Sequence, residues 1–328
     1  MRPSRGPLLV LGRGPLAQRL SAALGAENAP CLAASTTAYS DRARSPSEIW
    51  NLCGLLPTIA DVHDAARALG ETREIAAFAH DVGARLHHVS TMALGGDFEG
   101  IFTEKHFDEG QSLPNVLAQA AFDQELAVTT VAPTARIYRL AHLLGDTVTG
   151  EHELDGPAHF FEALFLTSLL VPQRWPLYGP DFGQTDVIPI DFAVAAMATL
   201  GDLAGAEGRV FHIGSGAALR TADVHNAFAD VARAPHARVL ERPSGPGSIA
   251  LATYRAFMTE ARWARLRSFA FRAISVPEVA LSRLAFEFTF DSTDTSRLLL
   301  GRGVVCPPLP QYAAAVWNYW LRELRINP

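Results

Sequence analysis

A short segment near the N-terminus constrains the fold more than any other part of the chain. Residues 7–11 form an apolar run that predicts a buried strand, and the pattern Gly-x-Gly-x-x-Ala begins directly after it. Gly12 permits a tight turn, Gly14 lets the backbone approach a phosphate, and Ala17 lets the next helix pack on the strand. Because the helix N-terminus then faces a pyrophosphate, we expect a dinucleotide site. The residues between these three positions are Arg13, Pro15 and Leu16.

The first half of the chain alternates strand-like runs with helical patterns. Such alternation predicts a parallel sheet with helices on both faces. The predicted fold class is therefore α/β, a Rossmann-like doubly wound parallel sheet. The expected strands are 7–11, 30–34, 49–53, 85–90 and a segment within 130–138, and the expected helices are 16–24, 60–69, 71–79 and 117–128.

The pattern loosens after about residue 140. We interpret residues 1–150 as a dinucleotide-binding core. Residues 151–328 form a mixed segment that completes the sheet and forms a smaller C-terminal substrate lobe or lid, within one integrated domain. Ligands of open α/β sheets bind at the carboxyl edge of the strands, which this lobe is expected to cover. The features of this half are a strand at 209–213, a closing helix at 311–324 and aromatic-rich segments at 156–182 and 253–272.

Composition excludes several functional classes. A chain of 328 residues with 48% hydrophobic composition can bury one large core. The net charge of -6 gives no electrostatic footprint for nucleic acid, and no stretch approaches the roughly 18 apolar residues of a membrane span. Cys31, Cys53 and Cys306 are far apart, odd in number and without metal-ligand spacing, which suits a reducing cytosol. We expect a cytoplasmic monomer or homodimer that binds a small molecule and no metal.

The end of the expected second strand bears on the choice of dinucleotide. An Asp or Glu that grips the adenosine ribose 2′-hydroxyl is missing there, and Ser35 and Thr36 stand in the place. Their hydroxyls, with Arg13 and Arg42, suit a 2′-phosphate, since arginine binds phosphate as a planar fork. This favours NADP(H) over NAD. The alternative is that the arginines are solvated loop charges, which applies most to Arg44.

Several further stretches match the motifs of one family. In them the chain resembles the extended short-chain dehydrogenase/reductase superfamily, especially its epimerase and thioester-reductase branches. The resemblance runs from residue 8 to about 213. The stretches are 51–54 (NLCG), 88–91 (HVST), 102–104 (FTE), 110–115 (GQSLPN), 137–139 (IYR), 145–150 (GDTVTG), 187–191 (VIPID) and 208–212 (GRVFH).

The resemblance implies a site at the carboxyl edge of the sheet. Ser90 is expected to hydrogen-bond a substrate carbonyl, and Asn115 stands just before the catalytic helix. The family's catalytic tyrosine aligns with Leu117 and its lysine with Ala121. Lys105 is the only lysine, so no shifted pair replaces them. The segment 35–48 is also too short for the family's usual helix, strand and helix. The further positions expected beside the cofactor are Cys53, Gly54, Arg139, Leu140 and His142.

A protein without this pair can recruit another acid, use an acid on its substrate, or abandon catalysis. General acid catalysis is worth about 10²–10⁴-fold, so the loss needs a replacement. The side chains considered as substitutes are Ser90, Thr91, Tyr138 and His142. Tyr138 is more typical of a packed residue, and His142 of a structural histidine. His87 and His88 alternate on one strand, so one is expected to face the core.

Protonation by the substrate is the favoured option. A ketone beside an acidic phenol, as in aromatic polyketides, supplies its own proton, and the aromatic segments of the second half suit such a flat substrate. In this respect the chain resembles tyrosine-less tailoring ketoreductases of antibiotic pathways, such as those acting on angucyclinones. The expected function is an NADPH-dependent ketoreductase. The alternatives are a non-catalytic NADP-binding regulator or scaffold, and a nucleotide-sugar epimerase or dehydratase.

Overall fold

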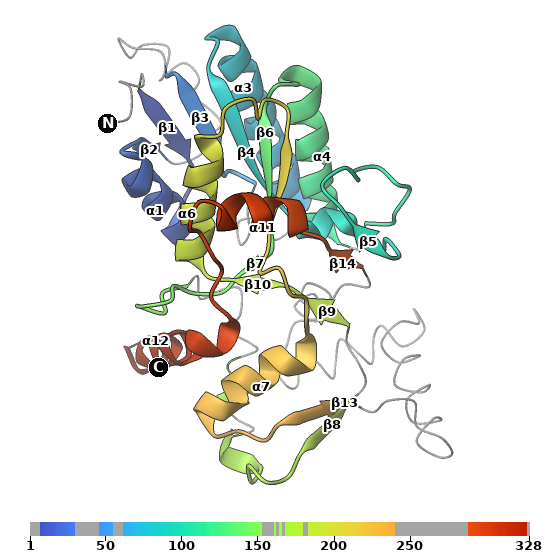
Figure 1. Ribbon diagram of the computed structural model, residues 1–328, viewed down its shortest axis with the longest axis vertical. Coiled ribbons are helices and arrows are strands. Elements are labelled where there is room, and N and C mark those ends of the chain that lie inside the picture. The colour runs from blue at the N-terminus through green and yellow to red at the C-terminus, as the bar shows by residue number, and fades with distance from the viewer. Residues whose placement is uncertain are drawn as a thin grey trace.

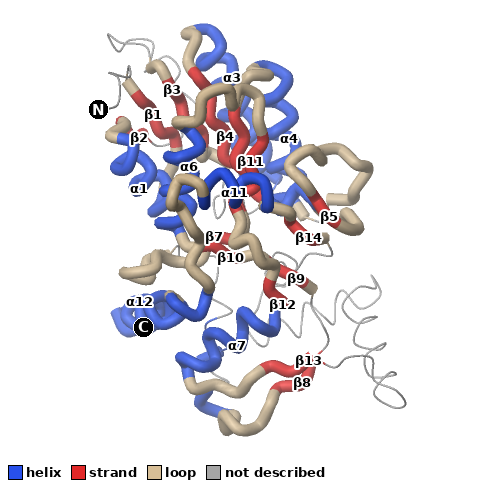
Figure 2. The backbone as a smooth tube through the Cα atoms, in the orientation of Figure 1, coloured by secondary structure: helices blue, strands red, loops and turns tan. Residues whose placement is uncertain are grey.

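Apolar runs from both halves of the chain pair into one sheet. The computed structural model describes residues 7–29, 46–54, 62–113, 115–152, 161, 164–165, 168–179, 183–239 and 288–326. Its main sheet has six strands, all parallel, in the order β11-β6-β4-β3-β1-β2 (Figures 1 and 2). The strands are β1 (Leu8–Leu11), β2 (Glu27–Ala29), β3 (Glu48–Asn51), β4 (Arg85–Thr91), β6 (Arg136–Leu140) and β11 (Val210–Ile213).

Helices cover both faces of the sheet, which confirms the predicted doubly wound α/β class. The helices α3 (Val62–Asp81) and α4 (Val116–Val131) pack against each other on one face. The helices α1 (Gly14–Leu24) and α6 (Ile190–Gly201) pack together on the other, with α11 (Thr293–Leu300) beside α6. Because both faces are covered, the strands are buried on both sides, and β3 is buried along its whole length.

Two element predictions need correction. The helices expected at 60–69 and 71–79 are the single helix α3, in which Gly70 has open space around its Cα and does not break the helix. A helical glycine costs only about 1 kcal/mol, which the packing of α3 offsets. The second strand is at Glu27–Ala29, because Gly25 ends α1 in the left-handed conformation and the chain enters the sheet two residues later. The segment 30–45 lies outside the described residues.

The second half adds small two-stranded pairs and a lobe. The lobe core contains Phe161, Phe228, Tyr312, Trp317 and Trp320, so part of the aromatic content of this half is ordinary packing. Its helices are α7 (Thr221–Ala232) and α12 (Ala313–Ile326). The pairs are β7 (His142–Leu143) with β10 (Val187–Ile188), β9 (Gln184–Thr185) with β12 (Leu219–Arg220), β8 (Leu177–Gly179) with β13 (Ala237–Val239), and β5 (Ile101–Phe102) with β14 (Thr289–Phe290). Short 3-10 helices lie at Met92–Gly95 and Leu309–Gln311.

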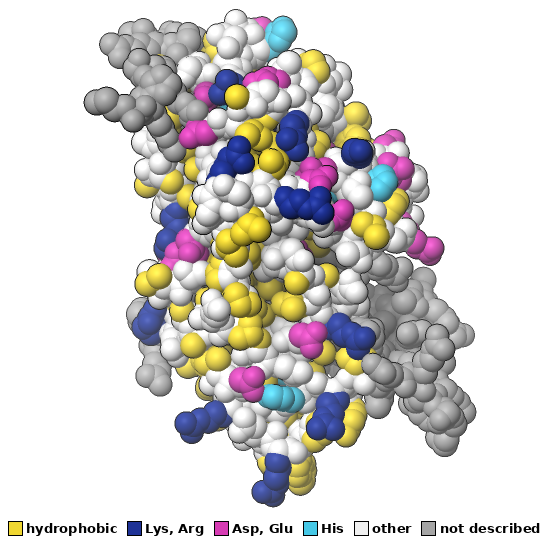
Figure 3. Space-filling model, viewed as in Figure 1, with side chains coloured by type: hydrophobic (Ala, Val, Ile, Leu, Met, Phe, Trp, Pro, Cys, Tyr) yellow, Lys and Arg dark blue, Asp and Glu magenta, His cyan; other side chains and the backbone are white. Residues whose placement is uncertain are grey.

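The described surface carries charges of both signs. On the face in Figure 3, Lys and Arg are interspersed with Asp and Glu, and hydrophobic side chains gather across the middle of the molecule. Trp175 and Tyr178, from the aromatic segment 156–182, are exposed. The other aromatic segment, 253–272, lies outside the described residues. None of the described helices is both long and apolar enough to cross a bilayer.

Asp186 connects the edge of the main sheet to the lobe. Its buried carboxylate accepts hydrogen bonds from the backbone N–H of Ser215, which follows β11, at 3.0 and 3.1 Å. Burial raises the pKa of Asp186 to about 6, although the Ser215 hydrogen bonds act in the opposite direction. Cys306 and Tyr312 are the titratable groups that interact with it electrostatically. The junction therefore holds a carboxyl group that is more easily protonated in the folded chain than in the unfolded chain.

This shift predicts a pH-dependent stability. An acid whose folded pKa is raised stabilises the fold fully below its unfolded pKa, near 3.8, and loses that contribution as pH rises through about 6. Relative to Asp186→Asn, the wild-type chain should lose about 2–2.5 kcal/mol of unfolding free energy between pH 4 and pH 7.5. Urea unfolding of both proteins across this range measures the difference. Parallel pH profiles for the two proteins would contradict the assignment.

Candidate functional site

The glycine turn between β1 and α1 has the geometry of a phosphate-binding turn. A Cβ on Gly12 would lie 2.8 Å from the Cβ of Leu52, so only glycine lets β1, β3 and α1 approach this closely. Gly14 has φ +81°, which favours glycine. Arg13 precedes α1 without a side-chain cap, and Pro15 occupies its first turn. The N–H groups at the start of α1 are therefore not taken by a capping side chain, and this fits a pyrophosphate.

The turn lies at the point where the sheet changes direction. The strand β2 pairs with one side of β1 and β3 with the other. Ligands of open parallel sheets bind at the carboxyl ends of the strands at such a point. Leu16 and Ala17 are buried beneath the turn, while Arg13 is exposed beside it. Ser35, Thr36 and Arg42, predicted to select the 2′-phosphate, lie outside the described residues.

Cys53 and Gly54 follow β3 at the same edge. Both are buried, and Cys53 is disulfide-bonded, whereas Cys306 is a free thiol. Cytoplasmic localisation stays a prediction.

Leu140 and His142 flank the end of β6. Leu140 is buried in the main core, and the His142 backbone N–H donates to the Asp186 carbonyl at 2.9 Å. Burial lowers the pKa of His142 to about 4, so its imidazole is neutral at pH 7. A neutral imidazole here is a poor proton donor to an alkoxide.

Arg139 has a different environment from the one expected of a cofactor ligand. Its guanidinium forms an ion pair with Glu125 of α4, and both side chains are almost fully buried. The Arg139 Nε–H donates to both Glu125 oxygens at 3.1 Å, and one Nη donates to the His106 carbonyl at 2.7 Å. These contacts join α4 to β6 and give no support for a cofactor role.

Ser90 lies near the carboxyl end of β4 on the face covered by α3 and α4. It is in register with Arg139 of β6, while His88, two residues earlier on the same face, is in register with Asn51 of β3. The Ser90 hydroxyl is buried and has no hydrogen-bond partner among the described residues. A buried hydroxyl without a hydrogen-bond partner lowers the stability of the fold. The Ser90 hydroxyl is therefore a candidate to hydrogen-bond a ligand at this edge.

The positions of the family's tyrosine and lysine lie on the adjoining face of α4. Leu117 and Ala121 are both buried and carry no polar atom in their side chains. Asn115 caps α4, because its Oδ1 accepts from the Ala118 N–H at 2.9 Å. Asn115 therefore fixes the start of α4, and any role for it in catalysis stays a prediction.

A buried polar network next to Ser90 was missed by the sequence reading. The Asn51 Oδ1 accepts from the Cys53 N–H at 3.0 Å, and the Asn51 Nδ2 faces His88 Nδ1 at 3.2 Å and Thr72 Oγ1 at 3.4 Å. Thr72 donates to Gln124 Oε1 at 3.0 Å. The signal was present, because Gln124 is a polar residue at the buried spacing of Leu117 and Ala121.

Two ends of this network have no partner among the described residues. They are His88 Nε2 and Gln124 Nε2. Burial lowers the pKa of His88 to about 4, so its ring is neutral and cannot be the missing acid.

The remaining candidate acids are engaged elsewhere. Tyr138 lies on the opposite face of the sheet from Ser90, where its hydroxyl is 2.8 Å from His87 Nδ1 and its ring stacks with Trp50. Burial raises the pKa of Tyr138 and lowers that of His87 to about 4. Both His87 and His88 are buried, because helices cover both faces. Thr91 caps the following 3-10 helix, because its hydroxyl accepts a hydrogen bond from the Ala93 N–H.

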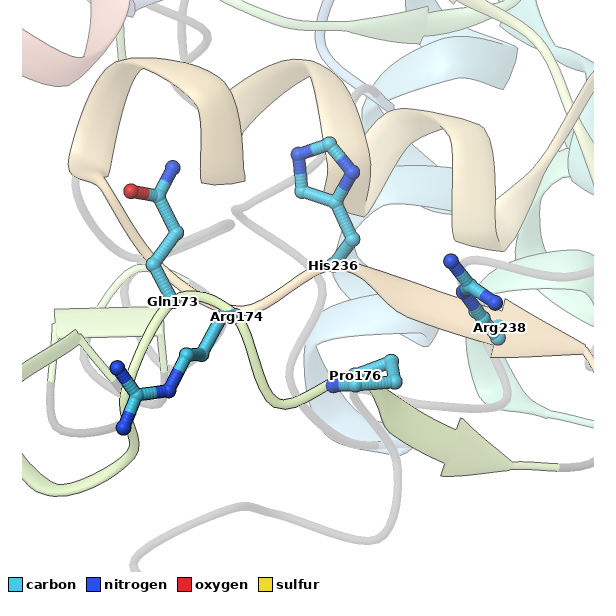
Figure 4. A pocket seen from close by; sticks show the side chains of 5 residues that line it. All are labelled: Gln173, Arg174, Pro176, His236 and Arg238. Carbon is cyan, nitrogen blue, oxygen red and sulfur yellow. The ribbon is translucent and has the colours of Figure 1, made fainter.

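A separate cavity of about 270 Å³ lies in the lobe beside β8 and β13 (Figure 4). In Figure 4 the side chains of Arg174 and Arg238 lie apart rather than converging on one point. No predicted site residue lines this cavity, whose lining is Gln173, Arg174, Pro176, His236 and Arg238. The candidate site is therefore the sheet edge formed by the glycine turn, Gly54, Ser90 and α4.

Several solved structures share this fold at low sequence identity. The terminal R domain from the myxalamid PKS-NRPS biosynthetic pathway is 17% identical, with 98% of this chain and 92% of that chain covered and a TM-score of 0.66. RMD from Pseudomonas aeruginosa complexed with NADPH is 13% identical, with 97% and 99% covered and a TM-score of 0.59. A UDP-galactose 4-epimerase is 14% identical, with the same coverage and TM-score. No family model and no curated protein match the sequence.

The packing at Gly54 predicts a specific sensitivity. A Cβ at this position would lie 1.7 Å from Gln124 Oε1 and 2.6 Å from Gln124 Nε2. Gly54→Ala must displace the buried carboxamide and break its bond from Thr72, which should lower the unfolding free energy by about 1–3 kcal/mol. Gly70→Ala in α3 is the matched control, since its Cβ meets open space and should stabilise by up to about 1 kcal/mol. Urea unfolding of both variants measures these changes in unfolding free energy. A Gly54→Ala protein as stable as wild type would contradict the packing of Gln124 on Gly54.

Proposed function

We propose that this chain is an atypical short-chain dehydrogenase/reductase, an NADPH-dependent ketoreductase that reduces a carbonyl on an aromatic polyketide-type molecule. The observation that carries the proposal is the uncapped start of α1 behind Gly14, at the same sheet edge as the unpartnered Ser90 hydroxyl. The first suits a pyrophosphate and the second a carbonyl oxygen. The solved structure with the same fold in complex with NADPH supports a nicotinamide cofactor.

The residues of this chain perform two tasks in the proposed reaction. NADPH, when bound, supplies the hydride. The glycine turn and the start of α1 hold the pyrophosphate, and Ser90 donates a hydrogen bond to the carbonyl oxygen as negative charge develops on it. Binding ketone and hydride donor in one orientation itself contributes several kcal/mol.

The proton is proposed to come from the substrate. Leu117 and Ala121 are apolar, and His88 and His142 have pKa values lowered to about 4, so none of these four residues donates a proton at pH 7. A phenol beside the ketone removes the need for a protein acid. The fold relatives include a domain of a polyketide and peptide pathway, which supports a natural-product substrate in general terms.

A non-catalytic NADP-binding regulator or scaffold is the second candidate. It is favoured by the same two apolar residues, since a protein that only senses the cofactor needs no acid. A nucleotide-sugar epimerase or dehydratase is the third, supported by the epimerase of the same fold. Cofactor binding with and without turnover of ketones distinguishes the first two.

The cofactor proposal predicts selective binding. Titration of the purified protein with NADPH and with NADH, followed by cofactor fluorescence, should give a Kd for NADPH at least about 10-fold lower, because arginine and hydroxyl groups favour the 2′-phosphate. Tighter binding of NADH would sink the NADP assignment. Binding of neither would sink the reductase and the sensor together.

The proton proposal predicts dependence on a substrate phenol. A polycyclic ketone with an adjacent phenol should be reduced at pH 7, and its phenol methyl ether should react about 10²-fold more slowly or worse, because the methyl ether cannot donate a proton. NADPH oxidation with each ketone measures this. Equal rates would show that the protein or solvent supplies the proton.

A further inference from the structure

One end of the lobe carries a concentration of exposed hydrophobic side chains. The segment 169–178 leads into β8, at the end of the molecule opposite the main sheet (Figure 1). Single exposed hydrophobic residues are ordinary, whereas several that lie close together form a patch that marks an interaction site. We name the four large hydrophobic residues of this segment the lobe patch. They are 60–77% exposed, and they are Leu169, Leu170, Trp175 and Tyr178.

Backbone hydrogen bonds order the aromatic part of the lobe patch. The Trp175 N–H donates to the Pro172 carbonyl at 2.9 Å, which closes a turn. Tyr178 of β8 is in register with Arg238 of β13 in a parallel pair. These two side chains are therefore neighbours on one face of the strand pair, and both are exposed. A partner meets a surface whose backbone is already in place, so little ordering opposes its binding.

The same surface is positively charged. The segment 168–179 and the strand β13 contain Arg174 and Arg238 and no acidic residue, although the whole chain has a net charge of -6. Asp230 of α7 lies at this end of the lobe, where it pairs with His236 at 2.6 Å. Neither Arg174 nor Arg238 has an ion-pair or hydrogen-bond partner among the described residues. Charge complementarity therefore favours an acidic ligand.

The cavity of about 270 Å³ lies within this surface and separates its charges. In Figure 4 the guanidinium groups of Arg174 and Arg238 lie on different sides of Pro176. A single small anion is held best where donors converge, so this arrangement suits two carboxylates at separate points of one larger ligand. The cavity between them has room for an apolar side chain of that ligand.

We propose that the lobe patch, together with Arg174 and Arg238, docks an acidic amphipathic segment of a partner protein. Tryptophan, tyrosine and arginine are the side chains that contribute most to protein interfaces, and all three are exposed here. The acidic face of the segment pairs with the arginines, and its apolar face covers the patch and the cavity. This inference does not depend on the proposed cofactor site.

Other occupants fit this surface less well. A second copy of this chain, paired about a two-fold axis at the patch, would bring the arginines of both copies together. A bilayer is disfavoured because Arg174 stands among the apolar side chains, where hydrocarbon would have to accept its charge. Single-stranded nucleic acid stacks its bases on rings, and Leu169 and Leu170 provide none.

Binding to a designed peptide tests the inference. The probe is a fluorescein-labelled amphipathic peptide of about 20 residues, with Glu on one face and Leu on the other at helical spacing. The wild-type protein should bind it with a Kd of about 10 μM or lower in fluorescence anisotropy, and the Kd should rise with salt concentration. The same peptide with Lys in place of Glu should show no binding at these concentrations.

Two variants separate the charged part of the surface from the apolar part. Arg174→Glu should raise the Kd for the acidic peptide about 10-fold, because a repulsive charge replaces an attractive one. Trp175→Ser should also raise it about 10-fold, because it removes an apolar contact. The matched controls are Arg302→Glu and Leu300→Ser, which change exposed residues at the end of α11 and should leave the Kd within about 2-fold of wild type. Urea unfolding checks that all four variants fold.

The outcomes either support or overturn the inference. Weaker peptide binding in both patch variants and in neither control supports it. A wild-type protein that does not bind the acidic peptide, or that binds the Glu and Lys peptides equally, overturns it. Tighter binding to phosphatidylserine vesicles or to an oligothymidylate, lost in the same two variants, also overturns it and assigns the surface to a membrane or to nucleic acid. A wild-type protein that binds the acidic peptide and no NADPH removes the proposed function alone.

Discussion

The position of α4 on the sheet determines the rest of the site, and a buried polar layer sets that position. Arg139 of β6 pairs with Glu125, and one residue earlier Gln124 connects through Thr72 to β3. Breaking a buried ion pair by removing one partner costs about 3–5 kcal/mol, so α4 cannot slide by a turn without leaving a charge uncompensated. An apolar contact alone would tolerate such a shift, since hydrophobic packing has no direction.

Because α4 is held in this position, its side chains determine which groups lie beside Ser90 at the carboxyl edge of the sheet. Its first turns bring Leu117 and Ala121 to the Ser90 side of the sheet, and the helix N-terminus is already occupied by the Asn115 cap. The opposite face holds the stack of Trp50, His87 and Tyr138, which is closed off from Ser90 by the sheet itself. Burial keeps His87, His88 and His142 neutral at pH 7, each with a pKa near 4. This edge therefore offers the Ser90 hydroxyl as a hydrogen-bond donor, while none of these three histidines titrates near pH 7.

The sequence patterns were enough to predict the fold, because the spacing of apolar residues in a strand or a helix shows which side chains are buried. The glycine turn, the parallel sheet and α4 were predictable on that basis, and the sequence alone showed that no tyrosine is followed four residues later by a lysine. The contacts of Arg139 were not predictable, because Glu125, His106 and His212 reach it from separate elements. The contacts of Gln124 were not predictable for a related reason. A polar residue on the buried face of a helix indicates that it has a hydrogen-bond partner, but the sequence does not show which residue the partner is. The predicted boundary between two helices at Gly70 was wrong, because a glycine weakens a helix without necessarily ending it.

The joint absence of a tyrosine at position 117 and a lysine at position 121 has a simple electrostatic logic in this fold. Burial raises the pKa of Tyr138 and of Tyr312 in this chain, because a phenolate is poorly solvated in the interior. A tyrosine at position 117, which is equally buried, would meet the same penalty unless a cation stood one turn away at position 121. The two residues are therefore useful only together, and a chain that obtains its proton elsewhere gains nothing by keeping one of them. The proposed use of a substrate proton requires only groups that bind, and the uncapped α1 turn and the unpartnered Ser90 hydroxyl beside the apolar Leu117 and Ala121 match that requirement.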